Sequence, residues 1–167
     1  RAGYYNLVEA QMRSGKPKDA KQTLERAAAR FPNRGFLHEY MTAIVYVDLK
    51  EYGTAIKHYQ SAETKAARND PTRLDARFYF QKGAALERDK QFARAEVAFR
   101  KSLKLNPNFA GALNYLGYMW AERGKNLNEA QQFIEKALKL SPGNAAYLDS
   151  MAWVLFQKGD AKNALKW

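Results

Sequence analysis

The chain has 167 residues, of which 46% are hydrophobic and 27% charged, a balance typical of a folded domain rather than of a disordered or fibrous chain. It has no cysteine, which excludes disulfides, thiolate metal ligands and a cysteine nucleophile. Its net charge of +11 is spread along both halves of the chain, so it indicates a general attraction to anionic partners rather than a nucleic-acid-binding arm. The longest run without a charge, residues 105–121, contains proline, glycine and asparagine and falls short of the ~20 apolar residues of a membrane span.

Apolar residues recur at intervals of three and four along the whole chain, which predicts amphipathic helices and no strands. The predicted helices cover residues 2–14, 17–30, 35–49, 52–68, 72–88, 92–104, 109–122, 126–139, 144–157 and 160–167. All five prolines fall at junctions between these segments, where the missing N–H and the fixed φ of proline do no harm. We therefore expect an all-α fold of consecutive helical hairpins.

A repeat of about 34 residues organises these helices. The alanines near the start of each second helix are separated by 35, 40, 35 and 34 residues; they are Ala20, Ala55, Ala95, Ala130 and Ala164. The expected repeats are 1–34, 35–75 with an extended second helix, 76–109, 110–144 and a partial repeat, 145–167, all within one domain. Because the last repeat stops within its second helix, we interpret the sequence as a fragment of a longer protein.

Glycines occupy two kinds of place in these repeats. Gly15, Gly124 and Gly159 come just after a first helix, where a left-handed backbone favours a residue without Cβ. Gly83 and Gly117 lie inside a first helix, where glycine costs ~1 kcal/mol against alanine. We expect the second helix of the hairpin to approach these two positions closely.

The repeat pattern resembles a known family. In a first helix, large and small residues follow the pattern large-x-x-large-small-x-x-large. In the second helix that follows, an alanine is followed four places later by a large residue, and a proline comes after the helix. The repeat 110–144 fills the first pattern with Leu113, Leu116, Gly117 and Trp120, and the second with Ala130, Ile134 and Pro142. Such positions resemble the tetratricopeptide repeat (TPR), and the resemblance covers the whole chain. It implies a right-handed α-α superhelix, a TPR solenoid, of about five helical hairpins with the last one truncated.

The last two repeats, 110–144 and 145–167, also resemble the C-terminal repeats of bacterial TPR proteins of the cell envelope. That likeness implies an envelope or periplasmic location, with the cytoplasm as the alternative. It leaves the organism and the compartment open.

The sequence offers little for catalysis. His38 and His58 lie on different predicted helices without a third ligand at helical spacing, although a metal site needs three or four ligands. Ser150 has no histidine in its own repeat or a neighbouring one, so no nucleophile-base pair is expected. We therefore expect no catalytic residue, no metal and no cofactor, and a protein that is not an enzyme.

The resemblance implies instead a concave groove, lined by the first helices, that binds an extended peptide or a partner helix. By the family's pattern, the residues expected in this groove are Tyr5, Asn6, Arg13, Arg77, Phe80, Gln81, Arg88, Asn114, Tyr115, Tyr118, Asp149, Trp153 and Phe156. Several are aromatic although they should face water, which is typical of a recognition surface. Trp153 and Phe156 have an alternative interpretation as core residues that a further repeat would cover, whereas Trp120 is expected in the core.

We expect a ligand with apolar anchors and at least one acidic residue, and we expect Phe80 and Tyr118 to be replaceable at little cost to stability.

Two other functions remain open. The basic surface could bind RNA or another anionic polymer. However, the groove positions of the family pattern also include glutamates, and together they carry a net charge of −1, which makes nucleic acid an unfavoured partner; the charged residues at these positions are Arg13, Arg77 and Arg88 against Glu9, Glu87, Glu122 and Asp149. The repeats could also form an accessory arm of an enzyme outside this fragment.

Another copy of the chain is also expected as a partner, in an end-to-end homodimer through the truncated repeat 145–167.

Overall fold

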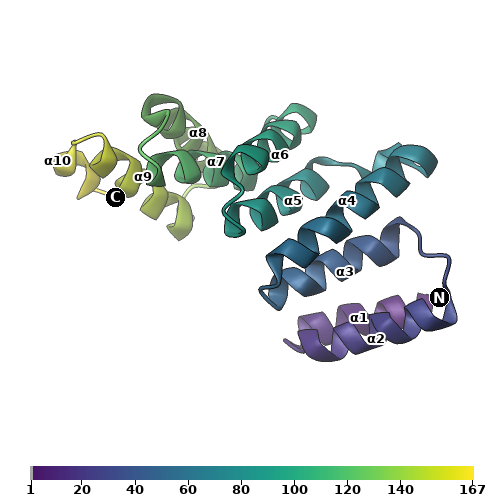
Figure 1. Ribbon diagram of the computed structural model, residues 1–167. Coiled ribbons are helices and arrows are strands. Elements are labelled where there is room, and N and C mark those ends of the chain that lie inside the picture. The colour runs from purple at the N-terminus through teal and green to yellow at the C-terminus, as the bar shows by residue number, and fades with distance from the viewer. Residues whose placement is uncertain (1) are drawn as a thin grey trace. The chain divides into compact units, whose positions relative to one another are not determined.

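The computed structural model describes residues 2–167, and this part of the chain folds into ten α-helices and one short 3-10 helix with no strand (Figure 1). The all-α prediction is therefore confirmed. The elements are α1 (Ala2–Arg13), α2 (Pro17–Arg30), α3 (Phe36–Asp48), α4 (Tyr52–Asn69), η1 (Pro71–Arg73), α5 (Ala76–Arg88), α6 (Phe92–Leu105), α7 (Ala110–Glu122), α8 (Leu127–Leu140), α9 (Ala145–Gln157) and α10 (Ala161–Ala164).

Most helices begin and end within one residue of the predicted bounds, and two differ more. The helix predicted at 72–88 begins only at Ala76, because the side chain of Asp75 accepts a hydrogen bond of 2.8 Å from the backbone N–H of Phe78 and so caps the helix there. The helix predicted at 160–167 spans only Ala161–Ala164. The second helix of the second hairpin, α4, has 18 residues, against 14 in α2, α6 and α8.

The helices group into two compact units. The N-terminal unit comprises the chain up to Leu74 together with Arg88–Gln91, and the C-terminal unit comprises Asp75–Glu87 and Phe92–Trp167. The N-terminal unit therefore contains α1 to α4, and the C-terminal unit contains most of α5 and all of α6 to α10.

One hydrophobic cluster of the N-terminal unit lies between α1, α2 and α3. Its buried side chains are Val8, Ala20, Leu24, Met41 and Val45, and three partly buried residues, Tyr5, Met12 and Leu49, pack against them. These residues recur at helical spacing, so the amphipathic pattern read from the sequence places one face of each helix in this core.

In the C-terminal unit, two glycines allow the helices of a hairpin to approach closely. A Cβ atom at Gly117 would lie 2.8 Å from Cγ1 of Ile134 and 2.9 Å from the carbonyl oxygen of Ala130, both on α8. A Cβ at Gly83 would lie 2.7 Å from the ring of Phe99 on α6. The close approach predicted at both glycines is confirmed.

The turns after the first helices use the left-handed backbone region, as predicted. Gly15, Gly124 and Gly159 have φ angles of +67°, +61° and +82°. In the other two hairpins a lysine has the corresponding conformation, with φ of +61° at both Lys50 and Lys90. These turns lead each first helix directly into its partner.

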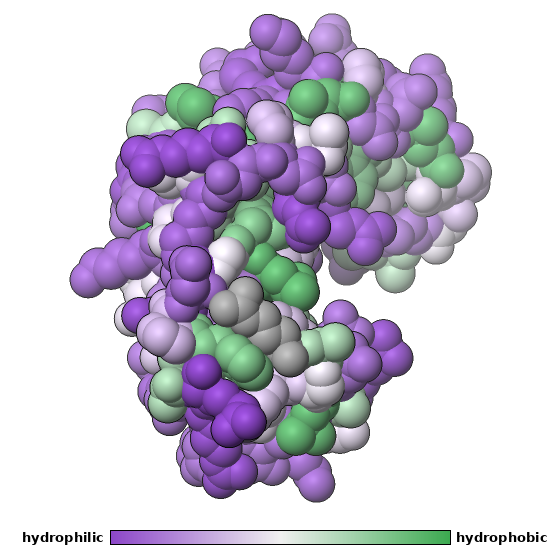
Figure 2. All heavy atoms as spheres, turned by 90° about the vertical axis from the view of Figure 1, so that its right-hand side faces the viewer, coloured by the Kyte–Doolittle hydropathy of each residue, from purple (hydrophilic) through white to green (hydrophobic). Residues whose placement is uncertain are grey.

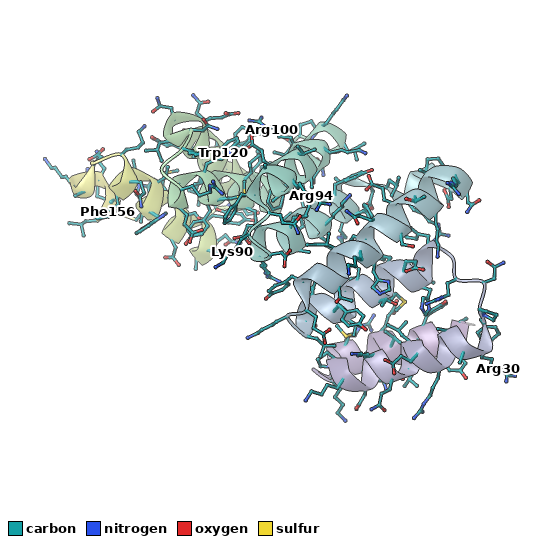
Figure 3. All side chains as sticks on the ribbon, viewed as in Figure 1. Arg30, Lys90, Arg94, Arg100, Trp120 and Phe156 are labelled. Atoms are coloured by element: carbon teal, nitrogen blue, oxygen red, sulfur yellow. The ribbon has the colours of Figure 1, made fainter. Side chains whose placement is uncertain are left out.

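Trp120 is buried, as predicted, and its indole nitrogen has a partner. Its Nε1–H donates a hydrogen bond of 3.1 Å to Oε2 of Glu96, and the guanidinium of Arg100 lies 5.0 Å from the ring centroid (Figure 3). Arg100 also pairs with Glu96 at 2.9 Å, so one network ties α6 to α7.

Charged and polar residues cover most of the face seen in Figure 2, where apolar residues form separate patches. Within residues 2–167, no helix is both long enough and apolar enough to cross a bilayer.

Candidate functional site

The predicted groove residues fall into two sets, because the two units divide the first helices between them. Tyr5, Asn6 and Arg13 lie on α1 of the N-terminal unit, with which Arg88 also groups. The other nine lie on three first helices of the C-terminal unit: Arg77, Phe80 and Gln81 on α5, Asn114, Tyr115 and Tyr118 on α7, and Asp149, Trp153 and Phe156 on α9. The C-terminal unit therefore contains the larger candidate surface.

On α1 the structure corrects the prediction for Tyr5. Its ring packs against the N-terminal core and lies 6.2 Å from the ring of His38, so it contributes to packing rather than to an open groove. Asn6 and Arg13 are exposed, and Arg13 forms an ion pair of 3.6 Å with Glu9 one turn earlier.

Phe80 and Tyr115, two aromatic residues of the predicted groove, form part of a ring cluster between α5, α6 and α7. Their ring centroids are 5.2 Å apart and nearly perpendicular, and Phe80 also lies 5.0 Å from Phe109. Phe99 contacts both of them, at 6.1 and 6.0 Å. Both rings are partly buried and pack against neighbouring rings, so we now expect replacement of Phe80 to cost stability, contrary to the expectation from the sequence.

Asn114 is a second correction. Only 7% of its surface is exposed, and its Oδ1 is buried without a hydrogen-bond partner among the described residues. A side chain this deeply buried cannot pair with the backbone of a ligand on the surface. Sequence spacing alone does not distinguish this position from its exposed neighbours on α7.

Three predicted groove residues are exposed aromatics: Tyr118 on α7 is 39% exposed, and Trp153 and Phe156 on α9 are 37% and 57% exposed. The rings of Trp153 and Phe156 stack, with centroids 5.7 Å apart and planes 25° from parallel, and Phe156 is labelled in Figure 3. We refer to these three residues as the aromatic face. It comprises the aromatic residues of the predicted groove that are exposed.

Acidic groups lie near Tyr118 of the aromatic face. Burial raises the pKa of the Tyr118 hydroxyl, and the carboxylates of Glu122 and Glu87 raise it further. On α5, α7 and α9, the predicted groove positions carry two positive charges, Arg77 and Arg88, against three negative ones, Glu87, Glu122 and Asp149. This surface is locally acidic although the chain as a whole is basic.

The end of the chain carries further apolar residues. Leu165 and Trp167 are exposed, and Trp167 lines an apolar hollow with Leu138, Pro142 and Leu148. Self-association through repeat 145–167 stays a prediction, which sedimentation velocity over a range of protein concentrations would test. A sedimentation coefficient that does not change with concentration would contradict it.

The N-terminal unit contains a charged cluster that the sequence did not reveal. Glu39 is buried on α3, and its carboxylate accepts hydrogen bonds from Nδ1 of His58, at 2.8 Å, and from Nζ of Lys65, at 2.5 Å. Burial alone would raise the pKa of Glu39, but the hydrogen bonds from His58 and Lys65 outweigh burial and lower the pKa to about 2. The only hint in the sequence is a charged residue on the apolar face of a predicted helix.

We expect this cluster to make stability depend on pH. Because the pKa of Glu39 is depressed in the folded state, its contribution is complete above the ordinary pKa of about 4.5 and is lost as the pH falls towards 2. Burial also lowers the pKa of His38, so the unfolded chain takes up this proton more readily and the folded protein loses stability as the pH falls below 6.5.

Urea unfolding at a series of pH values tests this expectation. Glu39→Gln should lower the free energy of unfolding by roughly 1–3 kcal/mol near neutral pH, as expected for the loss of charged hydrogen bonds. The difference from wild type should vanish as the pH approaches 2. A difference that is constant with pH would show that the charge of Glu39 does not stabilise the fold.

A family model of the tetratricopeptide repeat matches residues 5–73, 40–108 and 80–145. The chain therefore belongs to the TPR family, and the resemblance read from the sequence is confirmed. Proteins of this fold serve generally as scaffolds for protein–protein interaction and are generally non-catalytic. A search among curated proteins finds no match.

Solved structures show the same fold at low sequence identity. MamA (residues 41 to the end) from Desulfovibrio magneticus RS-1 has a TM-score of 0.82 and 22% identity, over 98% of this chain and 88% of that one. YrrB, described as a TPR protein with an unusual peptide-binding site, has a TM-score of 0.74 and 19% identity, over 98% and 80% of the two chains. A chain of the APC/C hetero-tetramer Cut9-Hcn1 has a TM-score of 0.83 and 21% identity, over 91% of this chain but 29% of its own length.

Proposed function

We propose that the protein is a non-enzymatic interaction scaffold that holds an extended segment of a partner protein on the aromatic face. The observation that carries the proposal is the exposure of Tyr118, Trp153 and Phe156 on two consecutive first helices of one unit. Large aromatic side chains bury much area at low cost in conformational entropy, and they are enriched among the residues that dominate binding energy.

The charges around the aromatic face suggest which segment fits it. Glu87 and Glu122 lie near Tyr118, and Asp149 precedes Trp153 by one turn on α9. A lysine or arginine above an exposed aromatic ring gains ~0.5–1 kcal/mol, and a carboxylate beside the ring adds to the attraction. We therefore propose a segment with an apolar anchor next to a basic residue, which replaces the acidic residue expected from the sequence.

A likeness in fold supports the peptide as the kind of ligand. YrrB, which has the same fold, is described as having a peptide-binding site. Stacked helical hairpins present side chains of successive helices in a row, and a row suits an extended chain better than a compact small molecule.

The local charge also argues against RNA as the ligand of this face, since a nucleic-acid site has to neutralise phosphates. The basic residues of α6 offer little compensation. Arg100 is engaged by Glu96 at 2.9 Å and by Glu129 at 3.5 Å, and the ammonium of Lys101 lies 4.1 Å from the ring centroid of Tyr79.

Selection from a random peptide library, followed by affinity measurement, tests the proposal. Peptides with lysine or arginine beside a large apolar residue should be enriched. Tyr118→Ala combined with Trp153→Ala should weaken the binding of those peptides by ~10- to 100-fold, as the loss of aromatic hot spots does. Because both side chains are partly exposed, the variant should keep the helical content of the wild type by circular dichroism.

The matched control is Val97→Ala combined with Leu105→Ala. Both are exposed apolar residues of the same unit, but they lie on the second helix α6. This control should bind peptides as the wild type does. Equal affinity of all three proteins for the selected peptides, or enrichment of acidic peptides, would contradict the proposal.

A further inference from the structure

The N-terminal unit contains a partly open cavity of about 120 Å³ between α2, α3 and α4. Since roughly 10–15 Å³ of such space suffices for one water molecule, the cavity has room for several waters or for one small ion. The residues that line it are Lys21, Leu24, Glu25 and Ala28 from α2, Arg34 from the following loop, His38, Thr42, Val45 and Tyr46 from α3, and His58 from α4. The aromatic face lies in the other unit, so this cavity is a separate feature.

His38 is one of the polar side chains that a ligand in the cavity would meet. Only 4% of this residue is exposed, yet its ring nitrogens have no hydrogen-bond partner among residues 2–167. The ring nitrogens are not sealed off from solvent, so water or a ligand in the cavity can pair with them. A neutral imidazole offers one donor and one acceptor, and a protonated one offers two donors.

His58 presents a donor from the opposite wall. Its Nδ1 lies 2.8 Å from the carboxylate of Glu39, which can only accept at this pKa, so Nδ1 carries the hydrogen. The ring stacks on Tyr46, with centroids 5.6 Å apart and planes within 6° of parallel, which fixes its orientation. Nε2 is the nitrogen left for a ligand, and it becomes a donor when the ring is protonated.

The fixed charges around the cavity favour an anion. Among the residues that line the cavity, Lys21 and Arg34 contribute two positive charges against one negative charge from Glu25, while the carboxylates of Glu39 and Glu51 lie behind the lining. Lys21 also lies 3.8 Å from Glu51 and 5.0 Å from the ring centroid of Tyr46, so its ammonium is held beside the cavity. No three His, Asp or Glu side chains of the described chain are arranged to hold a metal ion, and the two cations would repel one.

We propose that this cavity binds a tetrahedral oxyanion of the phosphate class, held by Lys21 and Arg34 and by N–H donors of His38 and His58. Such an anion has acceptor oxygens in four directions. The four donor side chains come from three helices and one loop, so they can approach it from different sides. The anion comes either from free phosphate or from a phosphorylated side chain of a partner, and the two sources share the chemistry of the bound group.

Binding should be coupled to proton uptake. Around His38, the titratable and charged groups are Tyr5 on α1, Lys21 and Glu25 on α2, Arg34 in the loop, Glu39 on α3, and His58 and Lys65 on α4. The cations among them oppose protonation of His38, as does burial. An anion in the cavity offsets both effects, so a bound anion should favour the protonated ring.

The two histidines allow a direct test, because they are the only ones in the chain and each gives one ring Cε1–H signal in NMR spectra. Sulfate is the first probe, since its charge stays fixed between about pH 6 and about pH 8. At constant ionic strength, both signals should shift in a saturable way as sulfate is added, with tighter binding at the lower pH. Shifts that stay linear in sulfate concentration, or that occur at neither histidine, would overturn the proposal.

Variants separate this site from general charge effects. Lys21→Gln combined with Arg34→Gln should weaken sulfate binding at least ~10-fold, because charge-assisted hydrogen bonds supply the affinity. The control, Lys18→Gln combined with Arg26→Gln, removes the same charge from exposed positions of α2 and should bind as the wild type does. His38→Gln should also weaken binding and reduce its pH dependence. If the variant with Lys21→Gln and Arg34→Gln bound sulfate as tightly as the wild type does, the result would contradict the proposed anion site.

Two further titrations distinguish the sources of the anion. Inorganic phosphate and N-acetyl phosphoserine amide are compared at one pH. Tighter binding of the phosphoserine compound would identify a phosphorylated side chain as the ligand, and tighter binding of phosphate would identify the free ion. Failure of both to saturate the histidine shifts would overturn the proposal.

Discussion

Replacing Phe99 with alanine is expected to lower the free energy of unfolding of the C-terminal unit by about 3–5 kcal/mol, the usual cost of removing a buried phenylalanine ring. Phe99 is completely buried on α6. Its ring lies against Gly83 of α5 and contacts Phe80 and Tyr115, so its loss opens a cavity where three helices meet.

Urea unfolding followed by circular dichroism measures this effect. Val97→Ala is the control, since Val97 lies on the same helix but is exposed, and it should change stability by less than ~0.5 kcal/mol. A comparable loss in the two variants would mean that Phe99 does not hold the three helices together.

Gly117→Val should destabilise the same unit by about 1–3 kcal/mol or more, the range for overpacking a filled core. Already the Cβ atom would lie 2.8 Å from Ile134 and 2.9 Å from the carbonyl oxygen of Ala130, and a backbone atom cannot move aside as a flexible side chain can. The extra methyl groups of valine add to this conflict between α7 and α8.

Gly3→Val is the matched control for this substitution. Gly3 also lies within a helix, α1, but nothing lies within 4 Å of the place where its Cβ would be. Thermal unfolding of both variants should show a large loss at position 117 and little change at position 3. A neutral effect at position 117 would show that α7 and α8 can separate without cost.

The helices could be predicted closely from the sequence because the signals for them are local. Apolar spacing of three and four, prolines at the junctions and glycines such as Gly124 in left-handed turns all act within a few residues. The start of α5 could not be predicted closely, because residues Pro71–Arg73 form a separate 3-10 helix and Asp75 caps α5 through its side chain.

The candidate site could be predicted only in part, because burial depends on contacts between helices. Phe80 and Tyr118 both occupy groove positions of the family pattern, yet Phe80 meets Phe109 and Tyr115 whereas Tyr118 stays exposed. In the charged cluster, His58 and Lys65 follow Glu39 by 19 and 26 positions and lie on a different helix. Helical periodicity cannot predict contacts between residues so far apart in the sequence.

This distinction between packed and exposed aromatic residues changes which variants are informative about function. Substitution of Phe80 or Tyr115 removes part of the ring cluster and therefore alters the fold and any binding together. Tyr118 and Trp153 are partly exposed, so their loss affects ligand binding more than stability.

Photo-cross-linking from the aromatic face tests the proposed function most directly. A photoreactive phenylalanine analogue replaces Tyr118 in one protein and Val97, on the second helix α6, in another, and each is irradiated with a selected basic peptide bound. If the segment lies on the aromatic face, the probe at position 118 will cross-link to the peptide beside its lysine or arginine, and the probe at position 97 will not. Cross-linking from position 97 alone, with the peptide bound in both cases, would contradict the proposed site.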